Sequence, residues 1–375
     1  MKNLLGYVKE ERRTFAQAPF TETDALALGW LAYFNYADPL RKGRGVPLSA
    51  LGEGELLPAR EMYADAYNPK TSRKLFAALR ENPRFSRAVL SRFSAERDET
   101  REIQFGALCI EYAPNEFFLA FRGTDPSFLG WKEDFNIARF FPIPSQTAAA
   151  NYAREAMCAH PFGVFCFGGH SKGGTNAVYA ASRLVPALRE RLRAVYNFDG
   201  PGFFQDIAAE EGYRAVENRI IKLVPRASFV GMILESGENF AIVRSRTVSV
   251  LQHDPFSWRV REGKFCRAEK RTRASVRLSD AFNGWIFALT PEERERFIGL
   301  VFGALDTLDT HDFTVFFKTL YRQVPALFKR YLRLPAADRR FFREALGRFF
   351  RLWLRRRKGS APHRRADALS SEEEG

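Results

Sequence analysis

The chain has 375 residues, of which 46% are hydrophobic and 36 are phenylalanine. This composition can form a substantial core, so it excludes a globally disordered chain and a small disulfide-stabilised fold. The sequence contains no apolar run long enough for a transmembrane helix, and its first residues lack a hydrophobic segment of signal-peptide length, so we expect no export through such a signal. The four cysteines lack metal-binding spacing, and we expect reduced thiols in a cytoplasmic protein that needs no metal or other cofactor.

The net charge of +14 is concentrated near the C-terminus. Residues 329–365 contain 14 lysine and arginine residues and two acidic residues, whereas the chain before Lys329 carries only +6. A basic character confined to one end argues against a nucleic-acid-binding fold, and we expect no nucleic-acid partner.

The first predicted elements are a helix and a pair of strands. The helix begins at Thr23-Asp24 and continues through an apolar run to Phe34. Apolar runs at 103–112 and 117–121, separated by the turn at 113–116, are typical of neighbouring strands.

A glycine-rich turn then separates a strand from a helix. The apolar strand at 163–167 leads directly into Gly168-Gly169-His170-Ser171-Lys172-Gly173-Gly174, and a helix from about Thr175 to Arg193 follows. Further strands are predicted at 194–198, 220–224 and 240–250. The order of strand, turn, helix and strand predicts an α/β fold with a mostly parallel sheet flanked by helices.

The pattern beyond about Lys264 predicts helices only. Thr290-Pro291-Glu292-Glu293 is a capping box with proline at the first helical position. The helices are expected to about Leu308, over 313–332 and over 336–357. We therefore expect three parts: a catalytic domain at 1–261, a helical C-terminal region at 262–358 and a disordered tail at 359–375.

The segment Gly169-His170-Ser171-Lys172-Gly173 fits the pattern Gly-x-Ser-x-Gly and lies between a strand and a helix. In such a sharp turn, glycine at both ends avoids a collision between strand and helix, and the serine stands clear of the sheet. The helix N-terminus there stabilises negative charge. We interpret Ser171 as a nucleophile, with Gly169, His170 and Gly173 forming its turn. The alternative is a glycine-rich turn without chemical function.

A serine hydroxyl needs a base to accept its proton, and the chain has five histidines. His170 lies inside the turn, His160 precedes the nucleophile strand, and His311 and His363 lie near the C-terminus. His253 follows the last predicted strand, where an α/β-hydrolase places its base, and we predict this role for it. The alternative is a histidine on a surface loop.

Asp199 is the carboxylate best placed to orient His253, because it follows a strand that ends at the same sheet edge as Ser171. The chain order Ser171, Asp199, His253 is that of the α/β-hydrolases. An aspartate before Gly-Pro is also a common turn residue. Asp254 adjoins His253, but neighbouring side chains on an extended loop usually diverge.

An oxyanion hole requires two backbone N–H groups, one from Lys172 and one from the end of an earlier strand, at 121–125. Phe121-Arg122-Gly123-Thr124, followed by Trp131, Asp134 and the Gly-x-Ser-x-Gly segment, resembles the class 3 lipases. The resemblance is closer to an uncharacterised bacterial branch of lipase-like α/β-hydrolases. The further segments that carry it, within about 23–258, are 197–203, 228–232 and 252–254.

This resemblance implies that Ser171 is the nucleophile, that His253 is the base, and that Thr124 and Lys172 donate the oxyanion hydrogen bonds. It also implies a lid over the site at about 126–135.

One position departs from the class 3 lipases. Those enzymes place their acid two residues before a Val-Pro pair, and this chain has Lys222 there, before Val224-Pro225. Either the acid has moved to Asp199 or the triad is incomplete.

The last predicted helix is basic and amphipathic. Its apolar stripe consists of Phe342, Leu346, Phe349, Phe350 and Trp353. One interpretation is a helix that lies on an anionic membrane surface through residues 336–358. The other is a helix packed on the body, with arginines in solvent.

Together these features favour a serine hydrolase that cleaves carboxylic esters of lipids or other acyl groups, in the cytoplasm or peripherally at a membrane. The alternative is an inactive hydrolase fold that acts as an interaction module at a membrane surface. The sequence leaves open the acyl-chain length, the oligomeric state, and whether thioesters or amides are cleaved.

Overall fold

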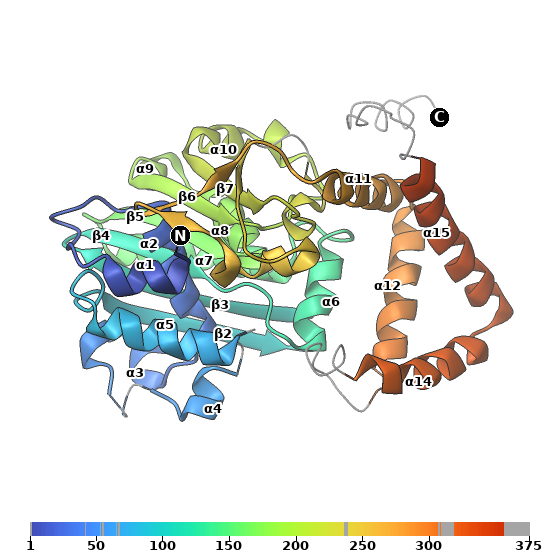
Figure 1. The fold of residues 1–375 in the computed structure, drawn as a ribbon, viewed down its shortest axis with the longest axis horizontal. Helices are drawn as coiled ribbons and strands as arrows, with labels where there is room; N and C mark the ends of the chain where they lie inside the picture. The colour runs from blue at the N-terminus through green and yellow to red at the C-terminus, as the bar shows by residue number, and fades with distance from the viewer. Residues whose placement is uncertain are drawn as a thin grey trace.

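The computed structural model describes residues 2–355 apart from 42, 53, 55, 65, 67, 236–238, 307 and 309–318. A nine-stranded sheet lies at the centre of the described chain, with helices on both faces (Figure 1). In sheet order the strands are β1 (Val46–Pro47), β2 (Val89–Asp98), β3 (Ile103–Ala113), β4 (Glu116–Phe121), β5 (Val164–His170), β6 (Leu192–Phe198), β7 (Ile220–Pro225), β8 (Phe240–Val243) and β11 (Arg267–Ala268). Strands β4 to β8 are parallel to one another.

The α/β fold with a parallel sheet core is therefore confirmed, and antiparallel strands complete both edges of the sheet. The predicted strand at 240–250 is shorter than expected, because β8 ends at Val243. Beyond it, Ser245 Oγ accepts a hydrogen bond from the N–H of Thr247 (3.1 Å), a local bond that competes with strand pairing. Residues Ser249–His253 then form a short 3₁₀ helix, η6.

Helices cover the two faces of the sheet (Figure 1). One face carries α1 (Leu4–Glu10), α2 (Glu22–Gly29) and α5 (Pro69–Glu81), and the other carries α7 (Pro144–Ala159) and α8 (Lys172–Ser182). In β3, Leu108 and Ile110 belong to the first core, whereas Ala107 and Cys109 belong to the second. Side chains alternate between the faces of a strand, so a strand buried on both faces is apolar throughout.

Short elements connect these layers. They are η1 (Trp30–Tyr33), α3 (Asp38–Arg41), η2 (Leu48–Ala50), α4 (Ala59–Met62), α9 (Pro186–Arg189), η3 (Ile207–Ala209), α10 (Glu211–Arg214), η4 (Glu217–Arg219), η5 (Val230–Met232), η7 (Pro255–Ser257), β9 (Val260–Arg261) and β10 (Lys264–Phe265). The helix predicted over 175–193 is divided into α8 and α9, since Pro186 lacks an N–H and begins a new helix.

The C-terminal helices form an arm at one end of the molecule, beside α6 (Phe128–Asn136) (Figure 1). The arm contains α11 (Arg273–Phe287), α12 (Pro291–Leu305), α14 (Leu320–Arg333) and α15 (Ala336–Arg355). The predicted capping box at Thr290 and Glu293 is present. The sheet continues past residue 261 through β11, so the helical part begins at Arg273.

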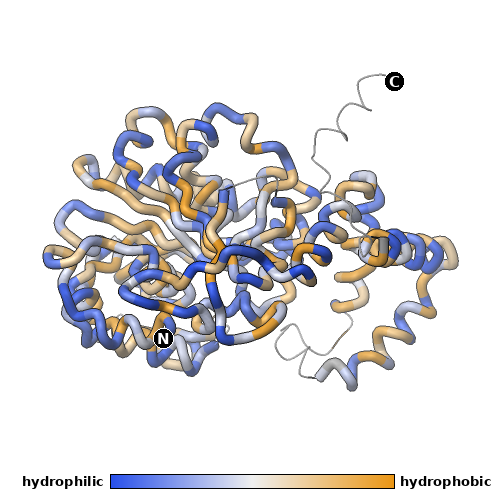
Figure 2. Tube along the Cα trace, turned by 45° about the horizontal axis from the view of Figure 1, so that its top comes forward, coloured by the Kyte–Doolittle hydropathy of each residue, from blue (hydrophilic) through white to orange (hydrophobic). Residues whose placement is uncertain are grey.

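Two hydrophobic clusters hold the arm together. In the first, Phe342 and Leu346 of α15 pack with Trp285 of α11 and Phe297 of α12. Much of the apolar stripe predicted for the last helix is thus packed inside the arm. Hydrophobic and hydrophilic residues alternate along the arm helices (Figure 2).

Both clusters also join the arm to the body: the first includes Ile143, and in the second Phe128 of α6 packs with Ile298, Phe302 and Leu305 of α12. Within the described residues, none of the helices has the length and apolar character needed to cross a membrane. The predicted tail at 359–375, together with His311 and His363, lies outside the described residues.

Candidate active site

Ser171 lies in a strained turn between β5 and α8. Its φ of 58° and ψ of −134° are rare for a residue with a side chain. Because the chain passes close to itself there, a Cβ atom on Gly169 or Gly173 would lie 2.4 or 2.2 Å from the carbonyl oxygen of Phe121. The turn thus has the geometry of a nucleophile elbow, and it presents Ser171 at the start of α8.

His253 and Asp199 are hydrogen-bonded to each other. His253 Nδ1 lies 2.7 Å from Asp199 Oδ2. A carboxylate accepts, so Nδ1 carries the proton, and Nε2 is left with the lone pair that a general base requires. Asp199 is fully buried after the end of β6, and Ser228 Oγ donates to its Oδ1 at 2.5 Å.

The structure therefore brings two of the predicted triad residues together. Asp254, the neighbouring acid, instead accepts a hydrogen bond from the N–H of Phe256 (2.9 Å) at the start of η7. Lys222 is buried in β7, at the position where class 3 lipases place their acid, and Asp199 supplies the carboxylate that contacts His253.

His170, in the turn that contains Ser171, supports His253 through the backbone of His253. Its ring centroid is 4.5 Å from that of His253, and its Nε2–H donates to the carbonyl oxygen of His253 at 2.8 Å. Tyr33 OH lies 3.3 Å from His170 Nδ1, which is then the acceptor. Burial lowers the pKa of His170 well below 6.5, and a positive charge on the neighbouring His253 would lower it further. A neutral imidazole fits both contacts.

Ser171 and His253 are thus linked through His170. Within the described chain, no hydrogen bond joins Ser171 Oγ directly to His253 Nε2. Such nucleophile–base bonds are often long without substrate and shorten in the complex.

The segment after β4 lies against Ser171. A Cβ atom on Gly123 would lie 3.3 Å from the Cβ atom of Ser171 and 2.4 Å from the carbonyl oxygen of His170. Thr124 follows directly and is buried. The predicted oxyanion donors Thr124 and Lys172 therefore lie on the two chain segments that adjoin Ser171.

The side chain of Thr124 is held by α6. Thr124 Oγ1 lies 2.8 and 2.7 Å from the two carboxylate oxygens of Asp134. Loss of water around this carboxyl group raises its pKa from 3.8 to about 6, while the charge of Lys172 and the hydrogen bond from Thr124 act in the opposite direction.

The side chain of Lys172 is held by the same helix. Lys172 Nζ donates to Glu133 Oε2 at 2.5 Å, to the carbonyl oxygen of Gln104 at 3.0 Å and to Gln104 Oε1 at 3.1 Å. Both charged side chains are fully buried, and Glu133 also accepts from the N–H groups of Gln104 and Ser145. Together these contacts satisfy the ammonium group and both carboxylate oxygens, with Oε1 accepting from Ser145.

Sequence reasoning missed several of these supporting residues. Glu133 lies between Trp131 and Asp134, two positions that carried the family resemblance, and this was its only signal. Tyr33 lies in an apolar helical run, and Ser228 lies in a segment that carried the resemblance without a role. The predicted lid at 126–135 includes most of α6, and its role stays a prediction.

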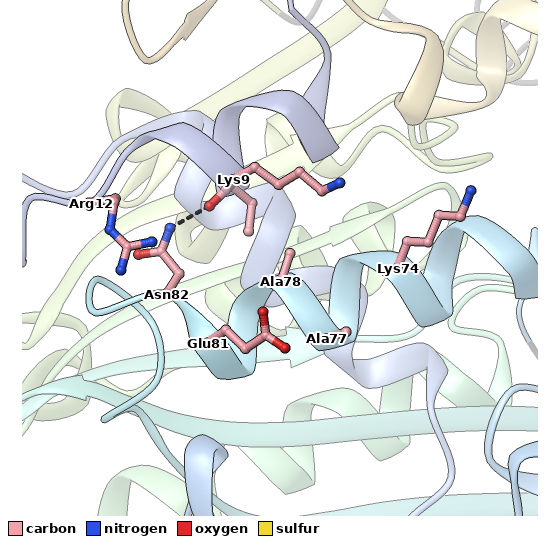
Figure 3. Close-up of a pocket in the computed structure, with 8 residues that line it drawn as sticks. Lys9, Arg12, Lys74, Ala77, Ala78, Glu81 and Asn82 are labelled. Atoms are coloured by element: carbon pink, nitrogen blue, oxygen red, sulfur yellow. Dashed lines mark hydrogen bonds between the residues drawn. The ribbon is translucent and has the colours of Figure 1, made fainter.

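The best-formed pocket among the described residues lies away from Ser171, Asp199 and His253. A pocket of about 390 Å³ lies between α1 and α5 (Figure 3) and is lined by Val8, Lys9, Arg12, Lys74, Ala77, Ala78, Glu81 and Asn82. Among the described residues, no group of three or more His, Cys, Asp or Glu side chains could hold a metal ion.

The geometry can be compared with known families. The sequence model of the Mbeg1-like family matches residues 79–303, which is more than half of the chain. The chain belongs to the Mbeg1-like family. The match includes Ser171, Asp199 and His253, and it confirms the resemblance to a lipase-like family. No protein with a curated description matches this Mbeg1-like chain.

Several solved lipase structures are similar to this Mbeg1-like protein at low identity. The Rhizomucor miehei lipase propeptide complex is 14% identical with a TM-score of 0.31, and the match covers 45% of this chain and 65% of that one. Lipase II from Rhizopus niveus is 16% identical with a TM-score of 0.31, over 46% and 69% of the two chains. Lip2 lipase from Yarrowia lipolytica is 11% identical with a TM-score of 0.32, over 65% and 82%.

Proposed function

We propose that this protein is a serine hydrolase that cleaves carboxylic esters of lipids or other acyl compounds. The observation that carries the proposal is the 2.7 Å contact between His253 Nδ1 and Asp199 Oδ2, at the sheet edge where Ser171 stands in a strained turn. A nucleophile, a base and an orienting acid are the groups that acyl transfer requires. Membership of a lipase-like family supports the ester as the substrate class.

In the proposed reaction, His253 Nε2 takes the proton of Ser171 Oγ as the oxygen attacks the ester carbonyl carbon. The carbonyl π electrons move onto oxygen, and the N–H groups of Thr124 and Lys172 stabilise this oxyanion. Asp199 stabilises the imidazolium and holds its Nδ1–H.

Collapse of the intermediate breaks the carbon–oxygen bond to the alcohol, which leaves with the proton from His253. A water molecule, deprotonated by His253, then attacks the acyl-enzyme. The acid is released, and the proton returns to Ser171 Oγ.

A fluorophosphonate probe and short p-nitrophenyl esters test the proposal. The wild-type protein should be labelled at Ser171, and Ser171→Ala should abolish both labelling and ester turnover. Absence of labelling in the wild type would instead support the inactive interaction module.

Two neighbouring acids provide a matched pair for testing the triad. Asp199→Asn should lower kcat by roughly 10²–10⁴-fold, since the imidazole loses its orienting carboxylate. Asp254→Asn should leave kcat within about twofold, because that carboxylate makes its hydrogen bond to Phe256. The reverse result would assign the acid to Asp254.

A further inference from the structure

Helix α14 presents an apolar stripe to solvent. The side chains of the stripe, with their exposed fractions, are Tyr321 (70%), Val324 (52%), Phe328 (59%) and Leu332 (54%). They follow one another at intervals of three, four and four residues, which places them on one face of the helix. A continuous exposed stripe of this kind marks an interaction surface.

A different face of α14 attaches the helix to the arm. Leu327 packs with the cluster that includes Ile298, Phe302 and Leu305 of α12. The ring of Tyr331 lies 6.2 Å from the ring of Phe342 on α15. The exposed stripe is therefore not needed to hold α14 in place.

Basic residues flank the stripe. Arg322, Lys329, Arg330 and Arg333 are all exposed, and α14 contains no acidic residue. The adjoining α15 also exposes Arg340, Arg343 and Arg351. The end of α15 adds three exposed apolar side chains, Phe350, Trp353 and Leu354.

We infer that α14 is a membrane-surface anchor whose partner is an anionic lipid bilayer. The apolar stripe would enter the boundary between headgroups and acyl chains, and the flanking cations would lie against anionic headgroups. The binding element would thus be α14 with Phe350 and Trp353 of the predicted stripe, since the other stripe residues, Phe342, Leu346 and Phe349, are packed inside the arm.

Charge distinguishes this partner from the other candidates. A second copy of α14 would bring four cations of each chain together without an acidic residue of α14 to pair with them. A nucleic acid would satisfy the cations but leave the apolar stripe in water. An anionic bilayer accommodates both features.

The anchor is connected to the candidate active site through α12 and α6. The cluster that holds Leu327 includes Phe128 of α6, and α6 holds both predicted oxyanion donors. Binding itself does not rest on the proposed hydrolysis, but it would place a hydrolase at the surface where lipid esters lie.

Vesicle sedimentation of the full chain tests the inference. Wild-type protein should bind mixed phosphatidylcholine/phosphatidylglycerol vesicles, should bind phosphatidylcholine vesicles at least about tenfold more weakly, and should lose affinity as salt is added. The triple variant Val324→Ser/Phe328→Ser/Leu332→Ser and the double variant Lys329→Glu/Arg330→Glu should each weaken binding by at least about tenfold. All five changed residues are exposed, and unfolding curves check that the fold is kept.

Phe162→Ser/Val185→Ser is the matched control, because it removes two exposed apolar side chains from the body. It should bind vesicles as the wild type does. Unchanged vesicle binding by both α14 variants would overturn the inference. So would a wild type that does not bind vesicles, or a wild-type dimer that the triple variant converts to a monomer without any vesicle binding.

Vesicle binding and fluorophosphonate labelling test the membrane anchor and the proposed hydrolysis separately. Ser171→Ala should bind vesicles as the wild type does, and the α14 variants should keep wild-type labelling by the soluble fluorophosphonate. Failure of vesicle binding with labelling intact would overturn the anchor alone.

Discussion

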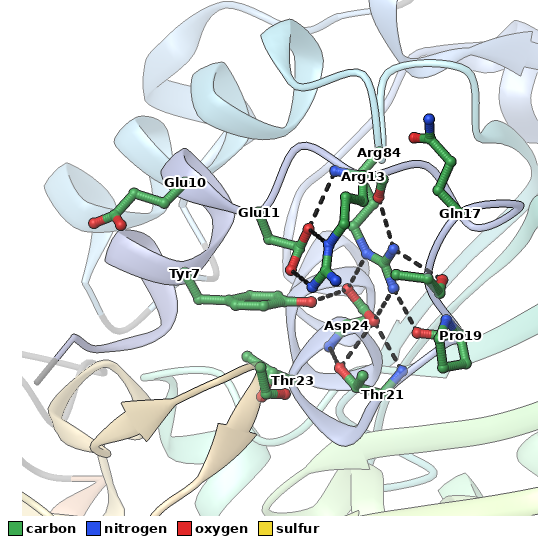
Figure 4. Close-up of polar contacts among 12 residues, drawn as sticks. Tyr7, Glu10, Glu11, Arg13, Gln17, Pro19, Thr21, Thr23, Asp24 and Arg84 are labelled. Carbon is green, nitrogen blue, oxygen red and sulfur yellow. Dashed lines mark hydrogen bonds and ion pairs between the residues drawn. The ribbon is translucent and has the colours of Figure 1, made fainter.

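Two buried ion pairs in this molecule are alike in chemistry and differ in what they connect. In the first, near the N-terminus (Figure 4), Arg84 Nε and Nη2 donate to the two carboxylate oxygens of Asp24 at 2.8 and 2.7 Å. Arg84 also donates to the carbonyl oxygens of Arg13 and Pro19, and Tyr7 OH donates to Asp24 at 2.8 Å. This network ties the N-terminal segment to the body.

The second pair, Lys172–Glu133, connects the turn that contains Ser171 to α6. Its groups are as fully buried and as well hydrogen-bonded as those of Arg84–Asp24. Burial alone therefore does not show whether an ion pair also supports catalysis. The difference is that Lys172 also supplies a backbone N–H to the predicted oxyanion hole, so its displacement should affect chemistry.

The largest effect is expected when Asp24 is changed. Asp24→Asn leaves the guanidinium of Arg84 buried without a counter-charge, and the free energy of unfolding should fall by about 3–5 kcal/mol, as measured in urea. The kcat of the remaining folded protein should not change, because the pair does not contact the site.

Tyr7→Phe is the milder control, since it removes one hydrogen bond to the same carboxylate and should cost about 1 kcal/mol. A fall in kcat of the folded Asp24→Asn protein would show that the N-terminal pair also supports catalysis.

A change at Lys172 should affect both stability and turnover. Lys172→Met leaves Glu133 buried and unpaired, which should cost about 3 kcal/mol. Displacement of the backbone N–H should also lower kcat by about tenfold, with little change in KM.

The double variant Lys172→Met/Glu133→Gln sharpens the comparison. It removes both charges, so it should regain most of the lost stability while kcat stays low. Recovery of kcat together with stability would make this pair purely structural, like Arg84–Asp24.

The smallest expected effect is the pH dependence of stability that the carboxyl group of Asp134 contributes. Its pKa in the folded protein is raised to about 6, above the ordinary value of 3.8, so between these values the folded state binds more protons than the unfolded state. The stabilisation is therefore complete at low pH and is lost as pH rises through about 6.

Asp134→Asn removes this titration. The stability of wild type relative to the variant should fall by about 1 kcal/mol between about pH 4 and pH 7, a modest value because the carboxyl is only partly buried. Urea unfolding of both proteins across this range measures it. A difference that does not vary with pH would contradict the raised pKa.

The sequence could predict features that depend on residues close together in the chain, and features that depend on where a strand ends. The spacing of Gly169, Ser171 and Gly173 predicts the turn, because the glycines are required by contacts of that turn itself. Asp199 and His253 could be paired because both follow strands of one parallel sheet.

Other features depend on contacts that local patterns do not encode. Glu133 and Lys172 are 39 residues apart, and their pairing depends on how α6 packs beside the sheet. The apolar stripes of α14 and α15 look alike in the sequence. Only the tertiary packing decides that Phe342 is covered and Phe328 is exposed.

Glu133 and Asp134 are consecutive residues of one helix. Through Lys172, Glu133 holds the start of α8, and through Thr124, Asp134 holds the loop after β4. Adjacent helical positions differ by about 100° around the axis and 1.5 Å along it, so the two carboxylates can reach two different chain segments. One peptide unit thus fixes the distance between the two backbone positions from which these carboxylates extend. Because a covalent bond does not lengthen with thermal motion, this limits how far the start of α8 and the loop after β4 can move apart.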